Sequence, residues 1–410
     1  MLLVCCCGGC GETLERVVPA APMSHSSSLE TMIVRSSIGQ TAKSLSNSML
    51  ILSEADTKRC FTVPDAIATT RKALASLVKD GGGEVPKRIG LPYAAASSSS
   101  SKSSPDDWSL FKPAAFYPAT TDSTNEEILM GMKMVSIRAN NPDKHNKGTV
   151  LATTMLLNSE TGEVSAIVAA TFLTGARTAA GSALATQLAF SNRNTSHGLM
   201  LVIFGAGLQA ELHIKCIQHV VNITRLVIVN RSIDRAHELK EMILNEQPHL
   251  ESETRTIITD ISIILLSDTE GVENAVKNAD IICTTTNACT PLFRGELLKP
   301  GCHINGVGSY TPSMQEIDDA TVQRSEILID TIEALDVGDL SSLKTGSDEL
   351  NSNVVCLIGD ALVGNVKFGT RIDDRIDCTF YKSVGTAIMD VFSAHVAVQN
   401  AKSLNIGVDM

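Results

Sequence analysis

The residues with the clearest chemical meaning form a glycine-rich motif in the middle of the chain. Gly205, Gly207 and Ala210 occupy the fixed positions of a G-x-G-x-x-A pattern, in which the intervening residues are Ala206, Leu208 and Gln209. Gly205 permits a tight turn, Gly207 lets backbone N–H groups approach a pyrophosphate, and Ala210 allows a helix to pack closely on a strand. The motif therefore predicts a dinucleotide site at a junction between a strand and a helix.

The residues about 20 positions beyond this motif indicate which dinucleotide is preferred. Asn230, Arg231 and Ser232 stand where NAD-binding proteins carry an Asp or Glu that binds the ribose 2′-hydroxyl. No carboxylate is present there to repel a 2′-phosphate, and Arg231 with Ser232 offers it charge-assisted hydrogen bonds. We expect NADP(H) to be preferred. The alternative is an NAD(H) site in which Arg231 is a solvated surface charge.

Alternating strands and helices must position this motif. The run Leu199–Phe204 is apolar without alternation, as in a strand buried on both faces of a parallel sheet. Similar runs occur at 226–229, 261–266, 280–285, 302–307 and 327–329, and helical patterns separate several of them at 208–221, 235–244 and 272–279. This pattern predicts a doubly wound α/β domain of the Rossmann type. Thr285 and Val307, at the ends of the fourth and fifth strands, are expected to contact the dinucleotide.

A different pattern precedes this region. Residues 51–78 have helical spacing with a capping box at Ser53 and Asp56, and runs at 128–137, 149–157 and 163–170 are typical of strands. This predicts an α+β domain at 48–176, before a dinucleotide domain at 177–370. Residues 371–410, with a strand at 377–382 and a helix at 385–403, are expected to return to the first domain. Residues 1–47 are expected to be a disordered leader or to precede the true start, and the Ser-rich run at 94–104 is expected to be a surface loop.

Composition excludes several classes of protein. The 410 residues carry 34 Lys and Arg against 45 Asp and Glu, a formal net charge of −11, so no overall basic field attracts nucleic acid. No stretch of about 18 apolar residues predicts a membrane span. Of the eleven cysteines, four lie in the first ten residues and the others are scattered, which is typical of a reducing compartment. We expect a cytoplasmic protein that binds a small molecule.

Two further features are given structural interpretations. Cys7 and Cys10 have the spacing of half a zinc knuckle, but no second pair of ligands lies nearby, so no metal site is expected. His303 lies in the apolar run at 302–307, where a catalytic role is conceivable. We expect it to pack within the sheet.

Five motifs, in order, resemble those of the ornithine cyclodeaminase and mu-crystallin family, and the resemblance extends from about Met49 to Leu404. They are Thr174–Ala180 (TGARTAA), Gly205–Ala210 (GAGLQA), Ala279–Thr284 (ADIICT), Lys299–Gly308 (KPGCHINGVG) and Phe380–Asp390 (FYKSVGTAIMD). The resemblance implies a homodimer whose middle domain holds a nicotinamide nucleotide.

The resemblance also implies a substrate site. Cations that bind the carboxylate of an amino or imino acid would be Arg88, Lys133 and Arg177, with Thr149 near the substrate. Lys133 would in addition exchange a proton with the substrate nitrogen. The C-terminal segment would line the nicotinamide pocket with Ser383 and Gly385.

One departure from the family pattern bears on the reaction. Tyr310 stands where ornithine cyclodeaminases carry an Asp that acts on the substrate amine. Because a phenol with a pKa of about 10 is a poor base at neutral pH, loss of ammonia followed by ring closure is not favoured. We expect an NAD(P)H-dependent reductase of cyclic ketimines such as pyrroline-2-carboxylate and piperideine-2-carboxylate, with Lys133, Arg177 and Tyr310 as catalytic residues. The alternatives are ornithine cyclodeaminase, an amino-acid dehydrogenase acting on an open-chain oxo acid, and a non-catalytic NADPH-binding protein similar to mu-crystallin.

Overall fold

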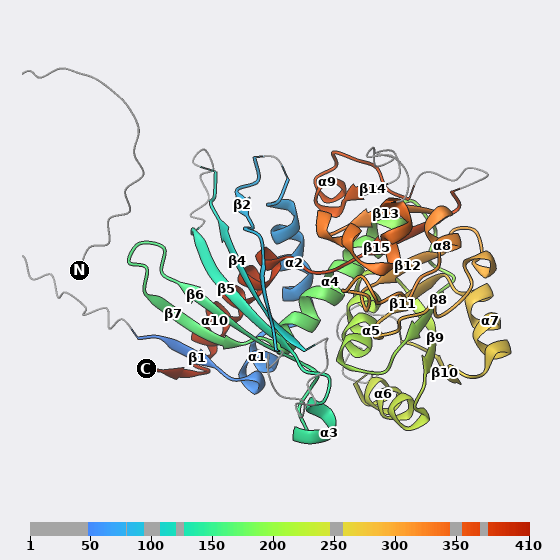
Figure 1. The fold of residues 1–410 in the computed structure, drawn as a ribbon, viewed down its shortest axis with the longest axis horizontal. Coiled ribbons are helices and arrows are strands. Elements are labelled where there is room, and N and C mark those ends of the chain that lie inside the picture. Colours follow the sequence, from blue (N-terminus) through green and yellow to red (C-terminus); the bar gives the residue numbers. More distant parts are fainter. Residues whose placement is uncertain are drawn as a thin grey trace, which may run out of the picture. The chain divides into compact units, whose positions relative to one another are not determined.

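A computed structural model describes residues 48–78, 80–93, 107–119, 127–246, 257–344, 355–369 and 376–410. The expected leader, the Ser-rich run and the Cys7–Cys10 pair lie outside these residues. The described residues form two eight-stranded sheets, each associated with helices (Figure 1). No helix in these ranges is long and apolar enough to span a membrane.

The first sheet has the strand order β16-β1-β7-β6-β5-β4-β2, with β3 also paired to β4. Apart from the parallel pair of β1 and β7, its strands are antiparallel. The helix α10 contacts β4, β5 and β6. The strands are β1 (Leu50–Leu52), β2 (Gly83–Glu84), β3 (Ile89–Pro92), β4 (Trp108–Phe116), β5 (Leu129–Ile137), β6 (Val150–Leu157), β7 (Val164–Ala169) and β16 (Val408–Asp409), and the helices of this region are α1 (Glu54–Cys60), α2 (Val63–Ala75), α3 (Asn141–His145) and α10 (Ala387–Leu404).

The predicted helix at 51–78 is two helices preceded by a strand. The capping box of Ser53 and Asp56 is confirmed at the start of α1. Thr62 and Asp65 form a second capping box, with a proline in the first turn, which starts α2 and separates it from α1. The three strands predicted between residues 128 and 170 are confirmed as β5, β6 and β7.

The second sheet is entirely parallel and has the order β10-β9-β8-β11-β12-β15-β13-β14. Its first five strands follow the 3-2-1-4-5 order of a doubly wound fold, which confirms the predicted fold class. The strands are β8 (Leu199–Phe204), β9 (Ile223–Asn230), β10 (Asp260–Leu265), β11 (Ile281–Thr284), β12 (His303–Gly306), β13 (Ser325–Ile329), β14 (Val355–Leu357) and β15 (Cys378–Lys382), and the helices are α4 (Thr171–Phe190), α5 (Leu208–Val220), α6 (Ile233–Glu246), α7 (Thr269–Asn278), α8 (Asp319–Gln323) and α9 (Ile358–Leu362).

The expected C-terminal return is correct for the helix and wrong for the strand. The strand β15 pairs in parallel with β12 and β13 in the second sheet, and all of its residues are buried, as a central strand of a parallel sheet requires. The chain then crosses to the first sheet through α10, and β16 pairs with β1. The expected boundary at 176/177 falls inside α4, which begins at Thr171.

Two histidines are fully buried in the second sheet and the helices beside it. His303 is confirmed as a packed residue of the sheet: its ring nitrogens bond to Thr379 (2.9 Å) and Asn305 (3.2 Å). His213 on α5 bonds to Ser182 (3.0 Å) and to the carbonyl oxygen of Gln209 (2.7 Å). Burial lowers the pKa of His303 to about 3 and that of His213 to about 4.

These shifts predict that the fold loses stability as the pH falls. Because the folded pKa of each histidine lies below its unfolded value of about 6.5, the unfolded chain binds more protons below pH 6.5, and this favours unfolding. Between pH 7 and pH 5, each histidine should lower the free energy of unfolding by about 2 kcal/mol. Urea unfolding at both pH values should show a smaller pH dependence for His213→Gln than for the wild type. An unchanged pH dependence would contradict the assignment.

Candidate active site

The carboxyl edge of the second sheet gathers the residues predicted to bind the dinucleotide. Since β8, β9, β11 and β12 are parallel neighbours, the segments after them meet at one edge. Gly205 has a φ of 114°, and a Cβ on it would lie 2.5 Å from Thr285 Oγ1. Thr285 donates from its N (2.9 Å) and its Oγ1 (2.8 Å) to the carbonyl oxygen of Phe204. The turn therefore requires glycine, and Thr285 fixes its position. Val307 donates its N–H to Thr284 at the neighbouring strand end.

The start of α5 is suited to an anion. Gly207 is its N-cap residue and, among the described residues, no side chain caps the helix and no atom beyond the chain neighbours of Gly207 lies within 4 Å of the position that a Cβ on it would occupy. Gly207 is exposed, and Leu208 and Gln209 of the first turn are half-buried, so the start of the helix is accessible. A pyrophosphate group fits this arrangement, because the amides and the helix dipole both favour an anion.

The segment after β9 presents the predicted cofactor-selecting residues. Asn230 Nδ2 donates to the carbonyl oxygen of Ser232 (2.9 Å), and Ser232 Oγ accepts from the N–H of Arg235 (3.4 Å). Arg231 is exposed at this turn. The turn is thus ordered by its own hydrogen bonds, with the arginine directed away from the core.

A second group of charged residues lies between the two sheets around the buried carboxylate of Asp390. Oδ1 of Asp390 accepts from Lys133 Nζ (2.9 Å) and from Arg177 Nε (2.9 Å). Lys112 Nζ lies 3.9 Å from Oδ2 and donates to the carbonyl oxygen of Gly385 (3.0 Å). We call Arg88, Lys112, Lys133 and Arg177 the cation cluster.

Four different elements bring these groups together. Lys112 on β4 and Lys133 on β5 are directly opposite each other in the antiparallel ladder. Arg177 lies on α4, which packs closely on α5: a Cβ on Gly175 would lie 2.6 Å from a Leu212 methyl carbon. Asp390 is in the first turn of α10, where the helix dipole stabilises a carboxylate.

The electrostatics of the cluster follow from burial and from the proximity of its charges. Burial alone would raise the pKa of Asp390, but Arg177, Lys133 and Lys112 hold it well below its usual value. Burial lowers the pKa of Lys133 to about 7 and that of Lys112 to about 8, with Asp390 opposing the shift and Arg177 adding to it. The cluster thus contains a permanently ionised carboxylate and two lysines that titrate near neutral pH.

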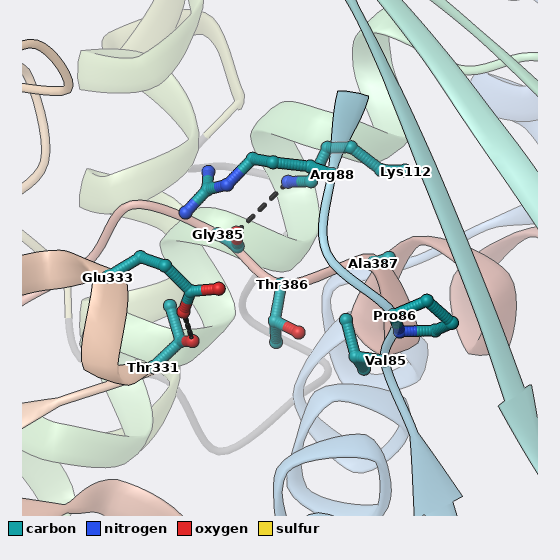
Figure 2. Close-up of a pocket in the computed structure, with 9 residues that line it drawn as sticks. All are labelled: Val85, Pro86, Arg88, Lys112, Thr331, Glu333, Gly385, Thr386 and Ala387. Carbon is teal, nitrogen blue, oxygen red and sulfur yellow. Dashed lines mark hydrogen bonds between the residues drawn. The ribbon is translucent and has the colours of Figure 1, made fainter. Parts of the chain in front are cut away.

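A pocket opens beside Lys112, where, among the described residues, no strand pairs with β4 on the side away from β5. β2 pairs with Ala115 and Phe116 of β4, and β3 pairs with residues 108–111, so the connection between β2 and β3 leaves the ladder beside Lys112. Figure 2 shows the pocket, with Thr331 and Glu333 across from Val85 and Pro86; it is lined by Val85, Pro86, Arg88, Lys112, Thr331, Glu333, Gly385, Thr386 and Ala387. Thr331 donates a hydrogen bond to Glu333.

The turn at 383–385 is shaped by another buried carboxylate. Asp330 accepts from Ser383 Oγ (2.7 Å) and from the N–H groups of Val384 (3.1 Å) and Gly385 (2.7 Å). Gly385 has a φ of 76°, and a Cβ on it would lie 2.4 Å from Arg177 Nη1. Glycine is therefore required for the turn to approach the guanidinium group. Ser383 and Gly385 thus lie beside the cation cluster.

The structure brings most, but not all, of the predicted substrate residues together. Lys133 and Arg177 meet at Asp390, and Arg88 lines the adjoining pocket. Thr154 is the residue opposite Lys133. Thr149 is five residues before Thr154, so it lies about 17 Å from Thr154 along the strand direction. It is not part of the cluster. Tyr310 is half-buried in the segment after β12.

Two residues of this site, Lys112 of the cation cluster and the carboxylate Asp390, were missed in the sequence. Lys112 lies in β4, a strand that was not predicted, and Asp390 was noted only as part of a motif. A signal for Asp390 was present: it is the only acidic residue in the apolar pattern of α10. A buried charge on a helix requires partners, and this could have directed attention to the lysines.

Comparisons with known proteins agree with this architecture. The model of the ornithine cyclodeaminase/mu-crystallin family matches residues 116–405. An uncharacterized cyclodeaminase of Dictyostelium discoideum is 30% identical over 380 residues, which cover 88% of this chain and 99% of that protein. A delta(1)-pyrroline-2-carboxylate reductase of Bacillus thuringiensis subsp. konkukian is 32% identical over 283 residues, which cover 68% of this chain and 79% of the relative.

Solved structures share this fold. The delta(1)-pyrroline-2-carboxylate reductase of Thermococcus litoralis, in complex with NADH and L-proline, superposes with a TM-score of 0.73 at 25% identity and covers 88% of this chain and 100% of that chain. An archaeal alanine dehydrogenase dimer with bound NAD has a TM-score of 0.70 at 24% identity, with coverage of 88% and 99%, which supports the fold alone. The extent of these matches establishes that the chain belongs to the ornithine cyclodeaminase/mu-crystallin family.

Proposed function

We propose that the protein is an NAD(P)H-dependent reductase that converts cyclic ketimines, such as pyrroline-2-carboxylate and piperideine-2-carboxylate, to L-proline and L-pipecolate. The observation that carries this proposal is the cation cluster, in which Lys112, Lys133 and Arg177 surround one buried carboxylate and Arg88 lines the adjoining pocket. The excess of cations favours an incoming acid. The similarity to delta(1)-pyrroline-2-carboxylate reductases supports this choice of substrate.

The residues of the chain would bind and orient the substrate. Its carboxylate would be attracted by Arg88, Lys133 and Arg177. The planar guanidinium of Arg177 is suited to form two parallel hydrogen bonds with a carboxylate. The bound nicotinamide cofactor supplies the hydride. Holding the C=N bond in one orientation is the largest contribution of the protein, because positioning turns a bimolecular step into a unimolecular one. Lys133, Tyr310 and water are the proton sources in the simplest form of this scheme.

A second candidate is ornithine cyclodeaminase activity, which the similarity to the uncharacterized cyclodeaminase of Dictyostelium favours. In that reaction the cofactor is regenerated and ammonia is released. Tyr310 would then have to replace the missing carboxylate. The two candidates differ in whether the cofactor is consumed.

One experiment separates the candidates. Purified protein is mixed with NADPH and either the five- or the six-membered cyclic imine, and NADPH absorbance is followed. L-ornithine with NAD, and pyruvate with ammonia and NADPH, are the comparisons. We expect stoichiometric NADPH oxidation with a cyclic imine. Ammonia release from ornithine without net change in the cofactor would instead support the cyclodeaminase, and no oxidation with either imine contradicts the reductase.

We further propose that NADP(H) is preferred over NAD(H), with Asn230, Arg231 and Ser232 around the 2′-phosphate. Arg231→Ala should raise the Kd for NADPH by about 10- to 100-fold, the effect of losing a charge-assisted hydrogen bond of about 1.5–3 kcal/mol, and leave the Kd for NADH nearly unchanged. Arg225→Ala is the matched control, because Arg225 is exposed on the same strand about 17 Å from Asn230. An equal rise of the Kd values for NADPH and NADH in the Arg231 variant would refute the preference for NADP(H).

We also propose that the chain forms a homodimer through the first sheet. Met134 on β5 and Leu151 on β6 are 41% and 40% exposed on the face opposite α10, and Ile89 and Leu91 on β3 are 60% and 55% exposed. Apolar exposure of this extent on one sheet is typical of an interface. Light scattering coupled to gel filtration should give a mass of two chains, which Met134→Glu should reduce to one.

A further inference from the structure

The two lysines of the cation cluster occupy different environments although they are direct neighbours in the ladder. Lys133 has a side chain only 1% exposed, its Nζ bonds to Asp390 Oδ1 at 2.9 Å, and it does not line the pocket. Lys112 lines the pocket, and its nearest carboxylate oxygen, Asp390 Oδ2, is 3.9 Å away, beyond hydrogen-bond distance. Lys112 is therefore the lysine that a molecule in the pocket would meet first.

The partners of Lys112 leave one of its hydrogens free to face the pocket. An ammonium group donates in three directions. One hydrogen is given to the carbonyl oxygen of Gly385 at 3.0 Å, and a second faces Asp390 Oδ2. Within the described part of the chain, that oxygen is buried and has no hydrogen-bond partner, whereas Oδ1 accepts two. The ammonium can therefore move toward Oδ2 without breaking a bond of Asp390.

We propose that Lys112, rather than Lys133, gives the proton to the substrate nitrogen, and that Asp390 is a positioning residue that holds Lys112 through Oδ2. This inference rests on the proposed reductase function. The C=N π electrons move to the nitrogen as the hydride of the dihydronicotinamide reaches the carbon. The nitrogen takes a proton from Lys112 Nζ, which becomes a neutral amine and regains its proton from water at the pocket mouth. The products are the cyclic amino acid and the oxidised nucleotide.

The charges around Lys112 favour loss of this proton. Arg88 lines the same pocket, and Arg177 and Lys133 converge on the same carboxylate, so three other cations lie around Lys112 and disfavour a further positive charge there. Burial and these cations lower the pKa of Lys112 to about 8, which keeps most of the group protonated at neutral pH and makes it a competent acid. The charged groups that face Lys112 from the surrounding elements are Arg88, Lys133, Arg177, Asp330, Glu333 and Asp390.

The first test is the pH dependence of kcat/KM for a cyclic imine in variants of the full-length protein. Lys112→Met should lower kcat/KM by about 10²- to 10⁴-fold, the usual contribution of a general acid, and abolish the decline of the wild-type profile above about pH 8. Lys112→Arg keeps the charge but cannot give up a proton, so it should fold, bind NADPH and lose the same activity. Lys277→Met, on an exposed lysine of α7, is the matched control.

A second measurement does not depend on turnover. Reductive methylation at pH 7, with lysine-containing peptides quantified by mass spectrometry, should label Lys112 faster than Lys133. Pyrrole-2-carboxylate, a planar analogue of the imine, should protect Lys112 from labelling.

The outcomes distinguish failure of this inference from failure of the proposed function. If the wild type reduces no cyclic imine, the reductase function is wrong, and the labelling result alone decides whether Lys112 faces an acid-binding pocket. If the wild type is active, retention of the alkaline decline in Lys112→Met, substantial turnover by Lys112→Arg, or preferential labelling of Lys133 overturns the assignment to Lys112.

Discussion

Asp390→Asn should lower the free energy of unfolding by about 3–5 kcal/mol at pH 7, which is the effect of removing one partner from a buried ionic group. The side chain of Asp390 is 2% exposed and is the counter-ion of Lys133 and Arg177, each at 2.9 Å. The neutral amide keeps the shape of the side chain but leaves these buried cations uncompensated. Urea unfolding of both proteins at pH 7 measures the difference.

The pH dependence of this difference has a defined sign. The folded pKa of Asp390 lies below its unfolded value of about 3.9, so its contribution is fully present above that value and is lost as the pH falls toward the folded pKa. The deficit of the variant should therefore shrink below about pH 4. Asp234→Asn is the matched control: Asp234 is an exposed carboxylate in the first turn of α6, and its loss should cost less than about 1 kcal/mol. Equal effects of the two substitutions would show that Asp390 is not the counter-ion of the cluster.

Arg177→Ala should lower kcat/KM for a cyclic imino acid by roughly 10²- to 10⁴-fold. This magnitude corresponds to two charge-assisted hydrogen bonds of about 1.5–3 kcal/mol each between the guanidinium and the substrate carboxylate. Because Arg177 Nε is already bonded to Asp390, the terminal nitrogens are the atoms that can face the substrate. Steady-state kinetics with NADPH in excess measures the effect.

The affinity for the nucleotide separates this role from a structural one. The Kd for NADPH of Arg177→Ala should stay within a few fold of the wild-type value, because the turn at 205–207 lies at the edge of the second sheet and is held by Thr285. Arg71→Ala removes an arginine of α2 that bonds to Gln187 of α4, and it should leave the kinetics unchanged. A collapse of NADPH binding in Arg177→Ala would mean that this side chain belongs to the nucleotide site.

The second sheet could be predicted from the sequence much better than the first. A strand buried on both faces must be apolar throughout, so the run Leu199–Phe204 gave β8 with its observed bounds. β4 contains Lys112 and Pro113 and carries no such signal. β15 was predicted as a strand but assigned to the wrong sheet. The sheet to which a short buried strand belongs depends on long-range pairing, which a local sequence pattern does not contain.

The candidate site was predictable only in part for the same reason. Arg88, Lys133 and Arg177 were identified through a family resemblance, and the structure brings them to one region. Asp390 is 257 residues from Lys133 in the chain. The contact between Asp390 and Lys133 forms because β15 pairs in the second sheet and the following helix, α10, packs against the first sheet. Lys112 became a candidate only when β4 placed it opposite Lys133.

Transfer of the isotope label from the cofactor tests the central claim most directly. NADPH carrying deuterium at C4 of the dihydronicotinamide, tested separately as each of its two stereoisomers, is incubated with protein and pyrroline-2-carboxylate, and the product is examined by proton NMR. The cluster should hold the acid so that its α-carbon faces the nucleotide, and therefore one stereoisomer should yield proline labelled at that carbon. Proline without deuterium at the α-carbon from both stereoisomers would contradict this orientation of the substrate.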